Sequence, residues 1–164
     1  MKLAQFSTNL LFALVMGVFW GTWFALSRSM AALREQTFLD IGHTTIRNLG
    51  FPMSILMPLS LVSAIVLLAL LPKRSMAFAL ALAGFLLMIV ALIVTLAIEV
   101  PIDRLIEQWT VATLPSNWRA LRDRWEFYHA LRTFVSIGAL GFTLASSLAS
   151  SGPCSQMDKR IATL

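Results

Sequence analysis

The chain has 164 residues, of which 58% are hydrophobic and 13% are charged, and its mean hydropathy is +0.79. Soluble domains carry about a quarter charged residues, so this composition excludes an ordinary soluble core and favours a protein that uses the bilayer as solvent. A net charge of +5 without a nucleic-acid-binding motif does not indicate nucleic acid as a partner, and a single cysteine, Cys154, excludes an internal disulfide framework.

Four apolar segments each approach the ~20 residues that a helix needs to cross the hydrocarbon core of a membrane. The first starts too late and is too long for a signal-peptide core, so we interpret it as a retained helix. The second begins at Pro52, a residue that suits a first helical turn. We therefore predict an all-α, four-transmembrane-helix bundle that forms a single domain over residues 1–164, with spans at about residues 9–27, 52–71, 76–98 and 130–150.

The connectors between these spans differ in length and polarity. Residues 72–75 make a tight turn that forces the second and third spans into an antiparallel hairpin. The other two connectors, residues 28–51 and 99–128, are longer and hold most of the polar residues, and we expect a short separate helix with His43 in the first of them. In a four-span topology both long connectors lie on one side of the membrane, so we predict that this polar end carries the function.

Orientation follows from the positive residues in the connectors. Eight of the 13 Lys and Arg residues lie at the polar end, and a simple count places that end in the cytoplasm. Several of these arginines are next to acidic residues, however, whereas Lys73 and Arg74 stand in a short loop and give the purer topological signal. We expect an integral protein of a bacterial inner membrane with both termini in the cytoplasm.

Small residues recur every four positions in the first and fourth spans. Such rows let membrane helices approach closely, since lipid gives them no hydrophobic reason to associate. We interpret the rows as packing surfaces inside the bundle, with a homodimer face as the alternative. The residues are Ala13, Gly17, Gly21 and Ala25 in the first span and Gly141, Ala145 and Ala149 in the fourth.

A block of Trp, Arg, Glu and His stands directly before the fourth span. At 100° per residue on a helix, five of its side chains share one face, with Glu126 on the shoulder of that face. These groups cost stability if they point into lipid, so they must face water, headgroups or a protein-lined cavity. The five residues are Trp118, Arg122, Trp125, His129 and Arg132.

Glu126 and His129 form a Glu-x-x-His pair, which places two potential metal ligands on adjacent positions of a helix. Di-iron bundles use this motif twice, whereas it occurs once here. Candidates to complete a site for iron, manganese, zinc or copper are His43, Asp103 and Glu99. The simpler interpretation is that Glu126 pairs with a neighbouring arginine.

A second interpretation of the same block needs no metal. His129 or His43 acts as a general base on an acidic C–H or phenolic substrate. Arg122 and Arg132 stabilise the resulting anion in a water-poor cavity. Tryptophan rings supply flat walls for an aromatic ligand, although tryptophans also anchor helices at membrane interfaces and arginines there bind lipid phosphate. The candidate walls are Trp109, Trp118 and Trp125.

The order of these motifs resembles the anthrone oxygenase-like family of small four-helix membrane proteins. The resemblance rests on Val100-Pro-Ile-Asp103, then Trp109, then Pro115-x-Asn-Trp118-x-x-Leu121-Arg122-x-Arg124-Trp125-Glu126-x-x-His129-x-x-Arg132. More loosely, it extends to Ile41-Gly-His43 and to Pro52 and Pro58, so that it covers nearly the whole chain. Asp103 stands where the family pattern usually has Asn, and it adds a negative charge that can pair with arginine or hold a cation.

The resemblance implies an oxidoreductase. Some fungal members of the family oxidise anthrones to anthraquinones with molecular oxygen, without an added cofactor. By this resemblance the substrate would be a lipophilic aromatic or quinone-like molecule, with His129 as the base and Arg122 as the anion stabiliser. Two further hypotheses stand beside it: a non-catalytic membrane subunit whose polar face docks a partner protein, and a metal-binding membrane protein built on Glu126 and His129.

Overall fold

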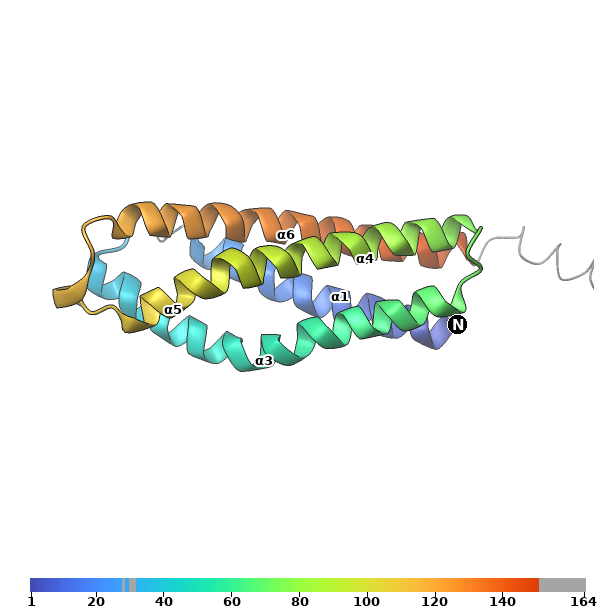
Figure 1. Cartoon of the computed structure of the whole chain (residues 1–164), viewed down its shortest axis with the longest axis horizontal. Helices are drawn as coiled ribbons and strands as arrows, with labels where there is room; N and C mark the ends of the chain where they lie inside the picture. Colours follow the sequence, from blue (N-terminus) through green and yellow to red (C-terminus); the bar gives the residue numbers. More distant parts are fainter. Residues whose placement is uncertain (28, 30–31, 151–164) are drawn as a thin grey trace, which may run out of the picture.

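The computed structural model describes residues 1–27, 29 and 32–150, so that Arg28 and Cys154 lie outside the described residues. Helices make up nearly all of the described chain, and no strand occurs in it, which confirms the predicted all-α class. The elements are α1 (Lys2–Thr22), η1 (Trp23–Ser27), α3 (Glu35–Leu70), α4 (Met76–Val94), η2 (Thr95–Glu99), α5 (Val100–Gln108), η3 (Val111–Thr113) and α6 (Trp118–Ala149), as drawn in Figure 1. Of the short elements, η1 and η2 are π-helical and η3 is a 3-10 helix.

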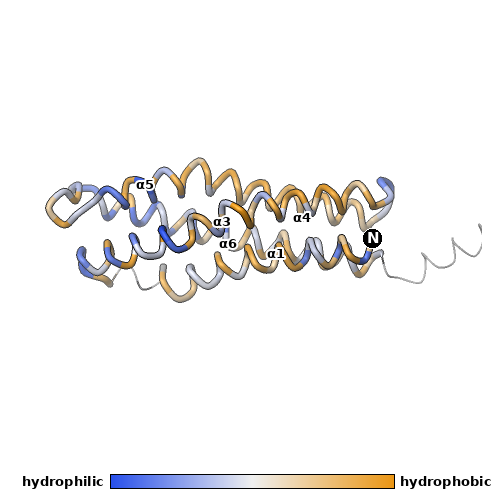
Figure 2. The backbone as a smooth tube through the Cα atoms, turned by 90° about the horizontal axis from the view of Figure 1, so that it is seen from below, coloured by the Kyte–Doolittle hydropathy of each residue, from blue (hydrophilic) through white to orange (hydrophobic). Residues whose placement is uncertain are grey.

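Four helical stretches are long and apolar enough to cross a membrane, which confirms the predicted four-span bundle. Their bounds are Lys2–Leu26, Glu35–Leu70, Met76–Gln108 and Trp118–Ala149. The N-terminus and the turn between α3 and α4 lie at one end of the bundle, and η3 lies at the other (Figure 1). Hydrophilic residues gather around α5, toward the η3 end, while the middle of the bundle is mainly hydrophobic (Figure 2). The bundle therefore has the expected polar end.

The first long connector is mostly helix, and the prediction of a short separate helix around His43 is wrong. Helix α3 runs without a break for 36 residues, with Pro52 and Pro58 inside it. Each proline removes one backbone hydrogen bond and bends the helix. Pro58 lies within the apolar stretch, where an interrupted helix would leave several backbone groups without partners, so continuing the helix costs less there.

The third span also continues past its expected end near residue 98. The amide of Val100 donates to the carbonyl oxygen of Thr95, five residues earlier, which makes η2 a π-helical turn. Pro101 then falls at the start of α5, where a missing N–H does little harm. Because a π turn inserts one residue, it shifts the register between α4 and α5. The result places Glu99 inside the bundle, with an exposed fraction of 0%.

Helices α4 and α6 pack closely against each other. A Cβ added to Gly84 would lie 2.8 Å from the carbonyl oxygen of Ala139 and 2.8 Å from Cγ2 of Thr143. In contrast, the small-residue rows of the first and fourth spans lie mostly on the outer surface, and Gly17 and Gly141 have nothing within 4 Å of such a Cβ. The prediction that these rows pack inside the bundle is wrong, and the homodimer face stays a prediction.

Replacing Gly84 with Val should lower the free energy of unfolding by about 1–3 kcal/mol, because the new side chain overlaps a backbone carbonyl of α6, which can shift only if the helix moves. The measurement is reversible unfolding of the purified protein in mixed detergent and SDS micelles. Gly17→Val is the matched control, since its side chain meets open space. Equal stability of the two variants would contradict the close approach of α4 and α6.

Candidate functional site

A cavity of about 390 Å³ lies between α1, α3, α4, η2, α5 and α6, within the size range of small-molecule sites. Most of its wall is apolar, with Phe19, Met53 and Met57 among its residues. The polar wall is formed by Thr22, Thr45, Ser54, Thr95, Asp103, Trp125, His129 and Arg132. An apolar chamber with a few polar groups suits an apolar ligand that carries one or two polar atoms.

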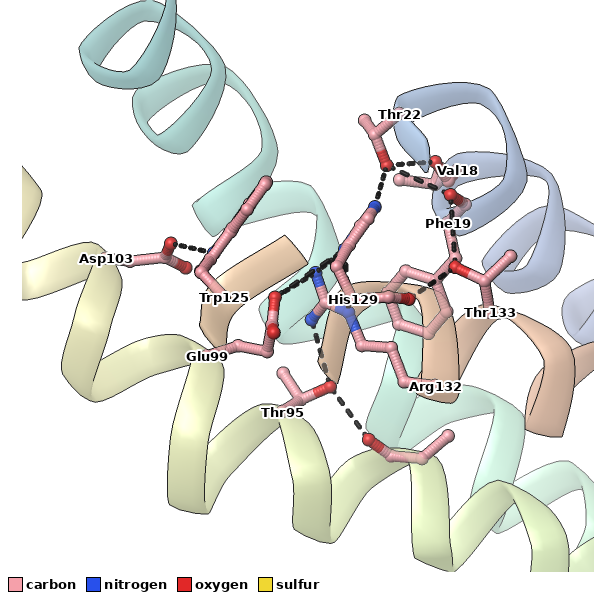
Figure 3. A network of polar contacts seen from close by, with 11 residues as sticks. Val18, Phe19, Thr22, Thr95, Glu99, Asp103, Trp125, His129, Arg132 and Thr133 are labelled. Atoms are coloured by element: carbon pink, nitrogen blue, oxygen red, sulfur yellow. Dashed lines mark hydrogen bonds and ion pairs between the residues drawn. The ribbon is translucent and has the colours of Figure 1, made fainter. Parts of the chain in front are cut away.

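His129 stands at the centre of a polar network in this cavity (Figure 3). Its Nδ1 receives hydrogen bonds from Nε and Nη2 of Arg132, at 3.1 Å and 2.7 Å. A guanidinium only donates, so Nδ1 is an acceptor and the ring proton of neutral His129 is on Nε2. That nitrogen lies 2.9 Å from Oγ1 of Thr22, which in turn donates to the carbonyl oxygen of Val18 at 2.9 Å. Backbone and arginine together fix the imidazole as an N–H donor at Nε2.

Arg132 is held from three directions. Its Nη2 lies 3.0 Å from Oε2 of Glu99, and its Nη1 donates to Oγ1 of Thr95 at 3.1 Å. The guanidinium carbon lies 4.4 Å from the centre of the Phe19 ring, a cation–π contact. Both charges are buried, so they depend on each other for compensation. The π turn η2 carries Thr95 and Glu99 and is therefore the element that positions the arginine.

Asp103 places a carboxylate on the cavity wall one helical turn beyond Glu99. Its Oδ1 accepts a hydrogen bond from Nε1 of Trp125 at 2.9 Å. The indole of Trp125 stacks on the imidazole of His129, with ring centres 5.0 Å apart and an interplanar angle of 1°. No Lys, Arg or His nitrogen in the described part of the chain lies within ion-pair distance of Asp103. Asp103 is thus a cavity carboxylate without a paired cation.

The prediction that five side chains share one face of the fourth span is confirmed, but only part of that face lines the cavity. Its five residues are all buried on one side of α6. Trp125, His129 and Arg132 line the cavity, but Trp118 and Arg122 do not. Instead, Nη2 of Arg122 lies 2.7 Å from Oδ1 of Asp123, and its guanidinium carbon lies 5.4 Å from the centre of the Trp118 ring.

Glu126 also lies outside the cavity lining, and its Oε1 is 3.7 Å from Nε of Arg122. This is the simple pairing that the sequence allowed. Nε2 of His43 lies 2.7 Å from the carbonyl oxygen of Ile106, and this contact links α3 to α5. Over residues 1–27, 29 and 32–150, no group of three or more His, Cys, Asp or Glu side chains is arranged to hold a metal ion.

Trp109 packs with Phe38, Ile102 and Ile106 in an apolar cluster at the polar end and does not line the cavity. The network also contains residues that sequence reasoning undervalued. The sequence indicated Glu99 only as a candidate metal ligand. Its position as an acidic residue at the end of a long apolar segment was the signal for a buried, paired carboxylate. Thr22 and Thr95 gave no signal, because a hydroxyl in a membrane helix usually bonds to its own backbone.

A sequence model of the family described as Anthrone oxygenase matches residues 46–142, more than half of the chain. The chain belongs to the anthrone oxygenase family. The matched segment holds Glu99, Asp103, Trp125, His129 and Arg132, whereas Thr22 precedes it. Comparisons with curated proteins and with solved structures give no significant match.

Replacing Glu99 with Gln should lower the free energy of unfolding by about 3–5 kcal/mol, because it leaves the buried cation of Arg132 without compensation. The same unfolding measurement in mixed micelles reports the change. Adding Arg132→Met to Glu99→Gln removes the unpaired charge and should restore part of the stability. Glu107→Gln, at an exposed position on α5, is the control and should be neutral. A stable Glu99→Gln protein would show that the ion pair does not hold the bundle.

Proposed function

We propose that this protein oxidises a lipophilic aromatic or quinone-like substrate with molecular oxygen in the cavity lined by Asp103, His129 and Arg132. The observation that carries the proposal is the composition of the cavity wall. One carboxylate without a paired cation, one imidazole N–H donor and one compensated arginine meet in a mostly apolar chamber of about 390 Å³. Membership of the anthrone oxygenase family supports the reaction class.

Asp103 is the proposed base. It removes a proton from a ring methylene that is acidic because a conjugated carbonyl lies across the ring. The electron pair left behind delocalises onto that carbonyl oxygen, and Arg132 stabilises the oxyanion. The Nε2–H of His129 also donates to the oxyanion when the ligand oxygen replaces Oγ1 of Thr22 as its acceptor. His129 is a poorer base in this arrangement, since its Nδ1 already accepts from Arg132. This proposal gives the base to Asp103 instead of His129 and the anion-stabilising role to Arg132 instead of Arg122.

Molecular oxygen is the oxidant. The carbanion transfers its electrons to oxygen and forms a C–O bond, and the peroxide takes up a proton to give a hydroperoxide. Loss of the second C–H proton with departure of hydroxide then gives the new carbonyl and water. One oxygen atom ends in the product and the other in water, so each turnover consumes one molecule of oxygen and leaves the base as it began.

Asp103→Asn should lower kcat for oxygen uptake with anthrone by about 10²–10⁴-fold, the usual contribution of a general base. The assay is an oxygen electrode with the protein in lipid nanodiscs. His129→Gln should lower kcat less, because it removes a donor to the oxyanion and not the base. Asp123→Asn is the control, since Asp123 pairs with Arg122 outside the cavity.

A fully active Asp103→Asn protein beside an inactive His129→Gln protein would assign the base to His129. Wild-type protein that consumes no oxygen with anthrone or with related acidic ring methylenes would contradict the oxygenase proposal itself.

We propose further that the protein is inserted in a bacterial inner membrane with both termini in the cytoplasm. The support is that the N-terminus lies at the same end of the bundle as the short turn with Lys73 and Arg74 (Figure 1). In a Cys154→Ser background, Ser116→Cys should react with a membrane-impermeant maleimide added to intact spheroplasts. Reaction only after lysis would reverse the orientation.

A further inference from the structure

The cavity has a buried floor and an exposed rim. Phe19, Met57 and His129 form part of the floor, with exposed fractions of 3% or less. The exposed residues of the lining lie on two elements only: Gly50, Ser54 and Pro58 on α3, and Leu96 on η2. The cavity therefore opens at the side of the bundle, between α3 and η2, and not at its polar end.

From residue 51 to residue 59 of α3, the exposed surface beside this opening is apolar apart from Ser54. On α3 it includes Phe51 and Ile55, with exposed fractions of 75% and 52%, and on the facing elements Ile93 and Leu96, with 58% and 59%. All four lie in helical stretches long and apolar enough to cross a membrane. Side chains of this kind contact lipid acyl chains in a membrane protein. The opening thus faces lipid and not water.

The shape of α3 explains why the opening exists. Pro52 and Pro58 are six residues apart inside the helix, and each lacks the N–H that would bond to the carbonyl of residue 48 or 54. The helix bows away from α4 and η2 at this level (Figure 1). Gly50 has no side chain there, and nothing lies within 4 Å of a Cβ built on it. Kinked backbone and a missing side chain together leave the cavity uncovered.

We propose that the cavity opens sideways into the acyl-chain layer between α3 and η2, and that an aromatic ligand dissolved in the bilayer enters through this opening. The identity of the ligand rests on the proposed function, whereas the position of the opening rests on the exposure of the rim. A ligand that enters between Gly50 and Leu96 reaches Met57 on the cavity floor without passing through water.

The first test asks what touches the rim. A bimane label at Ser54→Cys, in a Cys154→Ser background, is placed in bilayers that contain phospholipids with brominated acyl chains. Bromine should quench this label as strongly as a label at Ile65→Cys, a lipid-facing position on α3 that does not line the cavity. A label at Ser116→Cys, in the turn before α6, should not be quenched. Quenching of the Ser54 label by aqueous iodide instead of brominated lipid would overturn the proposal.

The second test asks whether a ligand uses the opening. Benzophenone dissolved in the bilayer is an aromatic ketone that reacts with methionine on irradiation, and mass spectrometry locates the adduct. Wild-type protein should be modified at Met57, which is 3% exposed and lines the cavity. Gly50→Phe fills the open space at the rim and should reduce this modification at least tenfold.

Gly141→Phe is the matched control, because Gly141 also has nothing within 4 Å of a built Cβ but does not line the cavity. It should leave Met57 modification unchanged, and exposed Met76, at the start of α4, should react equally in all three proteins. Undiminished modification of Met57 in Gly50→Phe, or none in the wild type, would overturn the proposed entry route. Neither result would contradict the oxygenase proposal, which is tested separately by the oxygen-uptake assay.

Discussion

The buried ion pair between Arg132 and Glu99 is the constraint on which the rest of the site depends. A guanidinium in an apolar bundle needs an anion, and Glu99 supplies it at 3.0 Å from a position with an exposed fraction of 0%. Once compensated, the arginine fixes the tautomer of His129 and leaves Asp103 without a partner cation. The reactive character of the cavity therefore follows from one charge pair, of which Arg132 lines the cavity and Glu99 lies behind it.

The π turn η2 makes that pair possible. A regular α-helix from α4 into α5 would place the residues after Thr95 in a different register, and Glu99 would leave the bundle interior. An extra residue in a helix disturbs the regular hydrogen-bond pattern, and π turns are frequent at functional sites. Here the turn directs Thr95 and Glu99 to the same guanidinium, so the backbone geometry of the five residues of η2 determines where Arg132 is held.

Hydropathy alone predicted the four spans, because a segment of ~20 apolar residues has few alternatives to crossing a bilayer. Periodicity also predicted that Trp118 to Arg132 share a buried face of α6. Spacing along one helix does not say which neighbour that face meets, and so it did not separate the cavity residues from Arg122 and Trp118. The continuation of α3 through Pro52 was missed because local proline rules describe helices in water, where an interrupted backbone finds new partners.

The length of α3 also determines how deep the cavity lies. Its 36 residues rise about 54 Å at 1.5 Å each, whereas the hydrocarbon core is about 30 Å thick. If the last 20 residues, from Phe51 to Leu70, fill that core, the first 16 stand beyond it and carry the polar end through the headgroup layer. Gly50 then marks the boundary between headgroups and acyl chains. A polycyclic molecule with one polar edge settles at this same depth, so the bilayer itself would concentrate and orient such a molecule beside the cavity before the protein contacts it.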